Sequence, residues 1–282
     1  MSWPPNLQRR DDKGTRGMTG SMEQPVISET RGSVLHVTID RPNSRNALSR
    51  ATLDALKRAF EDAAGNESLH IAVLSATGDK SFAAGGDLKE FDALRSEADA
   101  RLLFDRAAGA LDAIRSFPVP VVAALNGIAL GGGAELAMAC DYRLAAKHAR
   151  IGFVQSTLAI GTGFGGGADL IDKIGSARAM QLLVRGEVLS ADAAAALGLI
   201  DGVAEPDETL DECVARFVLP FLSRPAHLVR AVKQTGLAQR LGLPADERRT
   251  IERNGFAKTW AHPAHWEASD RLLAVSGSRR KP

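Results

Sequence analysis

The chain has 282 residues, of which 45% are hydrophobic and 24% charged, and its 35 Lys and Arg residues balance 34 Asp and Glu residues. A chain of this length buries a sizeable core, and its near-neutral charge favours neither nucleic acid nor a membrane surface over a small molecule as partner. No apolar run approaches the roughly 20 residues of a membrane span, and the N-terminus lacks the apolar core of a signal peptide. We therefore expect a cytoplasmic protein.

Composition also divides the chain. Residues 1–23 are rich in Arg, Asp, Gly, Ser and Pro without a hydrophobic period, which predicts a disordered leader. We expect a core over residues 24–205 and a C-terminal helical region over residues 206–282. The two cysteines, Cys140 and Cys213, lack a paired metal spacing and are interpreted as buried free thiols, so no metal site is expected.

The first elements follow from hydrophobic periodicity. We expect ordered structure from about Val26, and apolar residues alternate with polar ones over residues 35–39, which predicts a strand. Ser49 is expected to cap a helix in which Leu53, Leu56, Phe60 and Ala63 recur at helical spacing. Residues 71–74 then predict a short buried strand.

The same unit recurs further along the chain. The apolar run 121–125 predicts a strand, residues 134–138 a helix, and residues 142–145 another strand. Beyond Ser176 the pattern becomes almost wholly helical, with Ser176 and Ser190 as expected caps and three glycines as expected helix ends, namely Gly175, Gly186 and Gly198. Alternating strands and helices predict an α/β fold built from ββα units.

Two glycine-rich turns are the first candidates for chemistry. They occupy residues 83–88 and 131–135, each after a predicted strand. If the fold brings them together, the N–H groups of Gly86 and Gly132 point at one oxygen and form an oxyanion hole, the second helped by a helix N-terminus. The alternative is that these glycines merely permit tight turns.

Glu135 follows Gly132 by three residues, within the first turn of the predicted helix. Its carboxylate is then in reach of the same pocket, where it acts as a general acid or base or orients a water molecule. The alternative is that a glutamate in a first turn is favoured by the helix dipole alone.

Three segments in this order resemble signatures of the enoyl-CoA hydratase/isomerase (crotonase) superfamily: RPNSRNAL (41–48), FAAGGDL (82–88) and NGIALGGGAELA (126–137). Residues 141–143, 163–166 and 196–200 fit as well, so the likeness runs from about Val26 to the C-terminus. The resemblance implies a crotonase-like spiral of ββα units with a C-terminal helical trimerisation region.

The resemblance also implies an activity and a set of site residues. It implies a lyase or isomerase of fatty acid metabolism acting on an acyl-CoA substrate, assembled as a homotrimer or hexamer, without a cofactor beyond the coenzyme A of its substrate. The oxyanion-hole amides fall on Gly86 and Gly132 and the acid/base glutamate on Glu135. Substrate and CoA contacts fall on Asn46, Ala47, Ala84, Gly85, Asp87, Leu88, Lys89 and Gly131.

One position departs from the pattern. Hydratases of this family carry a second glutamate where this chain has Gln155, and dienoyl-CoA isomerases an aspartate where it has Gly163. Glutamine hydrogen-bonds a water or a carbonyl but does not exchange a proton near neutral pH. An oxyanion hole with one carboxylate suffices for decarboxylation of a malonyl-type thioester, because losing CO2 needs no base.

Two segments carry further likenesses. Residues 252–268 and Ala134 also resemble ethylmalonyl-CoA decarboxylase, with His262 and His265 either donating a proton to the enolate or lying on the surface. Residues 161–166 satisfy the spacing of a dinucleotide fingerprint, but no well-formed hydrophobic strand precedes them. A non-catalytic acyl-CoA-binding protein remains the alternative from another class.

Overall fold

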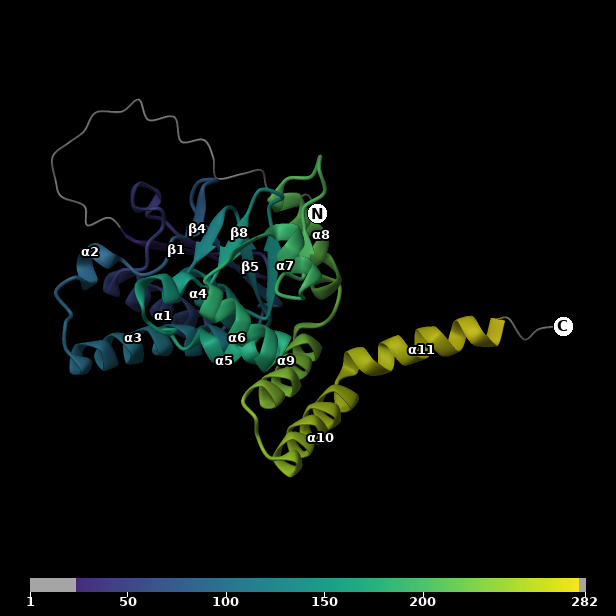
Figure 1. Ribbon diagram of the computed structural model, residues 1–282. Helices are drawn as coiled ribbons and strands as arrows, with labels where there is room; N and C mark the ends of the chain where they lie inside the picture. The colour runs from purple at the N-terminus through teal and green to yellow at the C-terminus, as the bar shows by residue number, and fades with distance from the viewer. Residues whose placement is uncertain (1–23, 279–282) are drawn as a thin grey trace, which may run out of the picture.

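The computed structural model describes residues 24–278, and its core holds two β-sheets surrounded by helices (Figure 1). The larger sheet has the order β1-β2-β3-β5-β7-β10, and only β1 and β2 pair antiparallel within it. Its strands are β1 (Val26–Arg31), β2 (Val34–Ile39), β3 (Ile71–Ala76), β5 (Val121–Leu125), β7 (Tyr142–Ala145) and β10 (Gly202–Val203). Central parallel strands are covered on both faces, which is why every residue of β5 is buried.

The smaller sheet has the order β4-β6-β8-β9 and consists of three-residue strands. They are β4 (Ser81–Ala83), β6 (Ile128–Leu130), β8 (Arg150–Gly152) and β9 (Val188–Ser190). The first three run parallel, and each follows a strand of the larger sheet along the chain. The predicted α/β fold of ββα units is thereby confirmed, and the carboxyl ends of β4, β6 and β8 lie at one edge.

The helices complete the units. They are α1 (Arg50–Ala63), α2 (Leu88–Phe91), α3 (Glu97–Arg115), α4 (Gly132–Ala139), α5 (Gly166–Ile174), α6 (Ser176–Arg185), α7 (Ala191–Ala196), α8 (Leu210–Leu222), α9 (Ala226–Arg240), α10 (Ala245–Ala261) and α11 (Pro263–Ser278), with 3₁₀ turns η1 (Pro42–Ser44) and η2 (Val154–Leu158). All eight residues of α4 are buried, so this helix is apolar on every side except for one carboxylate.

Helix ends test the predicted caps. Ser49 accepts a hydrogen bond from the Thr52 amide, and Ser190 from the Ala193 amide, as expected of N-caps. Ser176 does not cap, because it is already the first residue of α6, and Gly175 occupies the cap position with φ 81°. The region beyond Ser176 also contains the two short strands β9 and β10, which the helical pattern did not predict.

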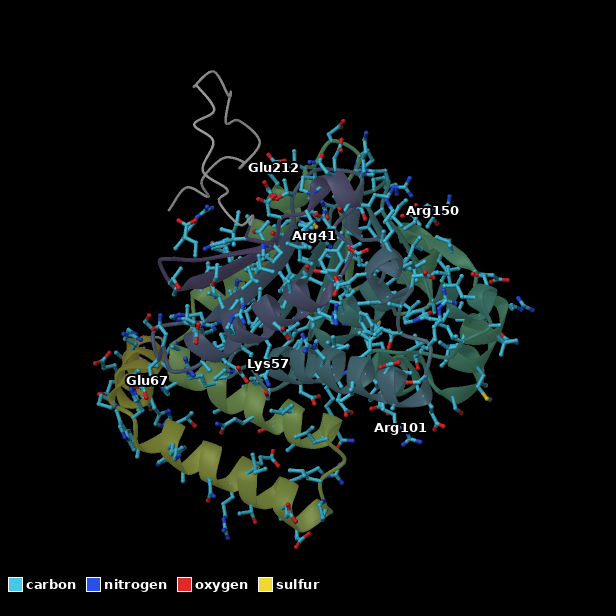
Figure 2. All side chains as sticks on the ribbon, turned by 90° about the vertical axis from the view of Figure 1, so that its left-hand side faces the viewer. Arg41, Lys57, Glu67, Arg101, Arg150 and Glu212 are labelled. Atoms are coloured by element: carbon cyan, nitrogen blue, oxygen red, sulfur yellow. The ribbon has the colours of Figure 1, made fainter. Side chains whose placement is uncertain are left out.

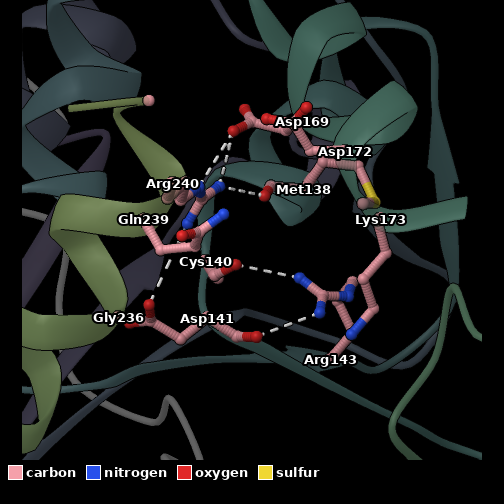
Figure 3. A pocket seen from close by; sticks show the side chains of 11 residues that line it. Met138, Cys140, Asp141, Arg143, Asp169, Asp172, Lys173, Gly236, Gln239 and Arg240 are labelled. Atoms are coloured by element: carbon pink, nitrogen blue, oxygen red, sulfur yellow. Dashed lines mark hydrogen bonds and ion pairs between the residues drawn. The ribbon is translucent and has the colours of Figure 1, made fainter. Parts of the chain in front are cut away.

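Ion pairs and hydrogen bonds of charged side chains connect α9 to the core. Asp169, 7% exposed, accepts from Arg115 Nη2 and from Arg240 Nη2, each at 2.7 Å. Arg240 also donates to the Met138 carbonyl at the end of α4, and Lys233 lies 2.6 Å from Asp141. Figure 3 shows Asp169, Arg240 and Asp141 around a cavity of about 530 Å³, and none of the predicted catalytic residues lines this cavity.

Helices α10 and α11 form an arm that leaves the body of the molecule (Figure 1). Its exposed apolar side chains are Phe256, Trp260, Trp266, Leu272 and Leu273, each at least 47% exposed. The predicted boundary near residue 205 falls between β10 and α8, and the predicted leader lies outside the described residues. Within residues 24–278, no helix is both long and apolar enough to cross a membrane.

Candidate active site

The predicted site residues follow the carboxyl ends of neighbouring strands in the smaller sheet. Gly86 comes after β4, Gly132 after β6 and Gln155 after β8. Since these strands are parallel and adjacent, their ends lie together, although more than twenty residues separate each segment from the next. The sheet therefore gathers three separate turns at one place.

The turn before α4 presents an amide. Gly131 has φ 52° and ψ −120°, a conformation that L side chains rarely adopt and that reverses the orientation of the following peptide group. Gly132 is the first residue of α4, so its N–H has no acceptor within the helix. In the described part of the chain, this N–H donates to no protein acceptor.

The turn after β4 presents a second amide. Leu48 pairs with this turn through two backbone bonds, in which the Leu48 amide donates to the Gly85 carbonyl and the Asp87 amide donates to the Leu48 carbonyl. This pairing passes over Gly86, whose N–H likewise has no protein acceptor in the described part of the chain. Two amides are thus available to a ligand.

One phenyl ring lies against both of these glycines. Phe164 Cζ is 3.1 Å from the position that a Cβ atom on Gly132 would take, and 3.4 Å from the corresponding position on Gly86. A side chain at Gly132 would also approach Phe164 Cε2 within 2.5 Å. The two glycine turns are therefore brought together, and glycine is needed at 132 because any side chain there would overlap the Phe164 ring.

Glu135 is 1% exposed and accepts four hydrogen bonds. Its Oε1 accepts from Gln155 Nε2 at 2.7 Å and from the Gly163 amide at 3.1 Å. Its Oε2 accepts from the Phe164 amide at 3.0 Å and from the Gly166 amide at 2.9 Å. These N–H groups take the place of water around a buried charge, which otherwise costs several kcal/mol.

The loop of residues 161–167, whose last two residues begin α5, wraps around this carboxylate, and a close approach at one glycine makes that wrapping possible. A Cβ atom on Gly166 would lie 2.5 Å from Glu135 Cβ, so any larger residue would push the loop off the glutamate. The loop follows η2, not a strand, and its amides face a carboxylate. The glycine spacing therefore serves Glu135 and does not form a dinucleotide fingerprint.

Gln155 is oriented by Glu135. A carboxylate only accepts hydrogen bonds, so the amide nitrogen of Gln155 must face it. The other end, Oε1, is buried and has no hydrogen-bond partner, and Gln155 Cδ lies 3.9 Å from the Cβ position of Gly131. An unpaired acceptor beside the Gly132 turn is the kind of group that a ligand or water satisfies.

The predicted CoA contacts fall into two groups. Asn46, 1% exposed, connects its own turn to the segment between β3 and β4, because Nδ2 donates to the Thr77 and Ser81 carbonyls and Oδ1 accepts from the Arg41 amide. A CoA contact of this side chain is therefore not what the structure favours, because a packed turn already satisfies its polar atoms. Any contact there falls to the backbone.

The other predicted contacts lie nearer the surface. Leu88 is 62% exposed and Lys89 is exposed on the short helix α2, while Asp87 forms an ion pair with Arg41 at 3.0 Å. Figure 2 shows Arg41 on the face that turns α1 and α3 to the viewer. Ala47 and Ala84 are half-buried, and Gly85 is buried. Binding of CoA by these residues stays a prediction.

His262 and His265 belong to a different part of the molecule. They lie at the junction of α10 and α11, where His262 stacks on His227 with ring centroids 3.6 Å apart and His265 packs on Trp260 at 4.5 Å. Figure 1 places this junction on the arm, away from α4. The structure therefore does not support a proton transfer from either histidine to the site of the same chain, because the junction lies away from α4.

Comparison with known proteins identifies the family. The family model for enoyl-CoA hydratase/isomerase matches residues 29–271. A crotonyl-CoA hydratase from Syntrophomonas wolfei is 35% identical over 228 residues, covering 78% of this chain and 87% of the relative. The chain belongs to the enoyl-CoA hydratase/isomerase family. It is accordingly a crotonase-family enzyme acting on CoA thioesters.

Two further likenesses bear on the fold and the reaction. The crystal structure of an enoyl-CoA hydratase from Mycobacterium smegmatis superposes with a TM-score of 0.83 at 31% identity, covering 92% of this chain and 98% of that one. An ethylmalonyl-CoA decarboxylase from Danio rerio is 32% identical over 254 residues, covering 88% of this chain and 82% of the relative. The crotonase fold is thereby confirmed, and relatives of both reaction types are similar to this chain.

Proposed function

We propose that this protein hydrates a 2-enoyl-CoA thioester through an enolate held in an oxyanion hole. The observation that carries the proposal is the convergence of two acceptor-free amides, Gly86 and Gly132, beside the hydrogen-bonded pair of Glu135 and Gln155. The thioester oxygen would accept from both amides, and the positive end of α4 would add to their field. Such donors stabilise an enolate by several kcal/mol.

The two carboxylate oxygens of Glu135 would have different roles, with Oε2 holding the loop and Oε1 binding the reacting water. Oε2 holds the loop through two buried amides, whereas the Oε1 bond to the Gly163 amide is part-buried and, at 3.1 Å, the longest of the four. A water molecule bound at Oε1 would replace that single bond and leave the loop in place. The water would donate its second hydrogen to the unpaired Gln155 Oε1.

The reaction then balances with one carboxylate. The water oxygen attacks Cβ, its proton passes to Glu135 Oε1, and the electrons of the C=C bond move to the thioester oxygen as an enolate. Cα of the enolate takes the proton back from Glu135, which completes the addition of H and OH. Gln155 orients the water and transfers no proton, so its lack of acidity is not an obstacle.

Decarboxylation of a malonyl-type thioester is the second candidate. Two observations favour it: Gln155 replaces an acid, and the Danio rerio ethylmalonyl-CoA decarboxylase is 32% identical to this chain. Against it stands the polarity of the site, because the Glu135 carboxylate and the free oxygen of Gln155 would both repel a substrate carboxylate. Hydration therefore fits the donors and acceptors better.

Substrate turnover separates these candidates. Crotonyl-CoA hydration is followed by loss of the enoyl absorbance, and methylmalonyl-CoA and ethylmalonyl-CoA decarboxylation by product mass. We expect hydration, with kcat reduced at least tenfold in Gln155→Leu, which removes the water's acceptor. Release of CO2 without hydration would establish the decarboxylase, and binding without any turnover would establish a non-catalytic protein.

We further propose that copies of the chain assemble through the arm of α10 and α11. Exposed Phe256, Trp260 and Trp266 give it an apolar surface that one chain leaves uncovered. We propose that the assembly is a homotrimer or a hexamer. We also propose that it lies in the cytoplasm and acts in fatty acid metabolism. Light scattering of the wild type and of Trp260→Glu, Trp266→Glu would show assembly and its loss.

A further inference from the structure

Phe164 has a position that the reaction outlined above does not use. Its ring is 5% exposed and packs against both glycines whose amides form the proposed oxyanion hole. On Gly132, the position of a Cβ atom would lie 2.5, 2.7 and 3.1 Å from three ring atoms, and the first two distances are shorter than real Cβ contacts. The ring therefore adjoins the hole and touches the backbone that builds it.

The backbone of Phe164 is held firmly. Its amide donates to Glu135 Oε2 at 3.0 Å, and Gly166 in the same loop donates to the same oxygen at 2.9 Å. Because Glu135 lies one helical turn after Gly132 on α4, a single helix carries both the amide and the group that positions the ring. These charge-assisted hydrogen bonds hold the backbone of Phe164, and the packing that leaves its ring 5% exposed limits how far the ring can move.

A second ring also lies against the first turn. Phe91 Cε2, from α2, lies 2.7 Å from the Cβ position of Gly86. The three atoms nearest to the Cβ position of Gly86 belong to Phe91 and Phe164, whereas all three nearest to that of Gly132 belong to Phe164. Phe164 is therefore the ring that lies close beside both glycines.

We infer that Phe164 is a specificity-determining residue that selects thioesters without a substituent at Cα. The inference rests on the proposed function, since it places the thioester oxygen between the two amides. Cα is then bonded to the carbon next to that oxygen, beside the ring. An unbranched enoyl chain carries only hydrogen on Cα, whereas a methyl group there adds a carbon atom beside a ring that the surrounding protein encloses, since Phe164 is only 5% exposed.

The test compares unbranched with α-branched thioesters. Hydration of crotonyl-CoA and 2-methylcrotonyl-CoA is measured for the wild type, Phe164→Ala and Phe164→Leu. The ratio of the two kcat/KM values should fall at least tenfold in Phe164→Ala, in line with the roughly 10- to 200-fold effect of one methylene or methyl group in an apolar pocket. Phe164→Leu should lie between the two.

A binding measurement keeps the inference separate from the reaction. Butyryl-CoA and 2-methylbutyryl-CoA undergo no hydration, and their Kd values by calorimetry should show the same loss of discrimination in Phe164→Ala. The matched control is Phe104→Ala, because Phe104, on α3, is 41% exposed and lies 3.7 Å from the Cβ position of Gly165 in the same loop, while the atoms nearest to the Cβ positions of Gly86 and Gly132 belong to Phe91 and Phe164.

The outcomes are distinct. If Phe164→Ala changes the ratio of the two Kd values but the wild type hydrates neither enoyl thioester, the proposed function is refuted. The role of Phe164 in selecting unbranched thioesters would then still stand. An unchanged ratio in a folded Phe164→Ala protein, an equal shift in Phe104→Ala, or no binding of either saturated thioester would overturn the inference. Thermal unfolding of each variant confirms that the protein tested is folded.

Discussion

Replacing Glu135 by glutamine tests whether its carboxylate holds the loop of residues 161–167. The substitution keeps the size of the side chain, removes its charge and turns one of its two oxygens into an NH2 group. In the best arrangement, this NH2 group takes the place of Oε1, and Gln155 rotates to accept from it through its free oxygen. The Gly163 amide then faces another donor and loses its acceptor.

The cost follows from these contacts. One buried donor left without an acceptor costs about 1–3 kcal/mol, and the two bonds that remain on the other oxygen lose their charge, at about 1 kcal/mol each. The sum is about 4 kcal/mol of unfolding free energy. For a chain of this size, 1 kcal/mol corresponds to roughly 2 °C, so we expect Tm to fall by about 8 °C.

Differential scanning calorimetry measures this fall. The matched control is Glu90→Gln, the same chemical change in a partly exposed ion pair with Arg50, for which a surface pair's contribution of about 0–1 kcal/mol predicts a shift within about 2 °C. A Glu135→Gln protein whose Tm lies within that control range would refute the claim that Glu135 holds the loop of residues 161–167, because the four hydrogen bonds would then contribute nothing to stability.

Three further predictions follow from individual contacts. Asp169→Asn removes the charge that Arg115 and Arg240 share, and should lower the unfolding free energy by about 3 kcal/mol in denaturant titrations, whereas a loss under 1 kcal/mol would contradict the buried network. Gly132→Ala keeps the amide but drives a methyl group into Phe164, so kcat should fall at least a hundredfold, and the double variant with Phe164→Ala should recover part of it; no recovery would contradict the contact. Burial lowers the pKa of His36 below that of the unfolded chain, so the unfolded state gains the proton first, and the unfolding free energy should decline as pH falls below about 6.5. His36→Gln should flatten that decline between pH 7.5 and 5.5, and an unchanged slope would assign it to other groups.

The sequence predicts the units of this fold because each carries a local signal. The β5 run is apolar throughout, and Ser49 ends a turn just before residues of helical period. The strands of the smaller sheet have only three residues each, too few for a periodic pattern, and Ser176 was misplaced because Gly175 takes the cap conformation instead. Short elements are therefore fixed by their neighbours and not by their own sequence.

The site was predictable in part for the same reason. Gly86, Gly132 and Glu135 lie in turns whose residue types are unusual, and the family resemblance assigns them. That Glu135 is surrounded by the amides of a loop more than twenty residues later depends on how α4 and α5 pack, which no local pattern encodes. Phe164 lay within a glycine run that resembled a phosphate-binding turn, and only the packing shows that its ring reaches both glycines.

Hydration of crotonyl-CoA by the wild type, compared with Gln155→Glu and Gln155→Leu, tests the central claim most directly. We predict that the wild type removes the enoyl absorbance catalytically, that Gln155→Glu retains hydration, and that Gln155→Leu loses at least tenfold in kcat. If the wild type leaves crotonyl-CoA unchanged while releasing CO2 from ethylmalonyl-CoA, or if Gln155→Leu hydrates as fast as the wild type, then Glu135 and Gln155 do not bind and activate water as proposed.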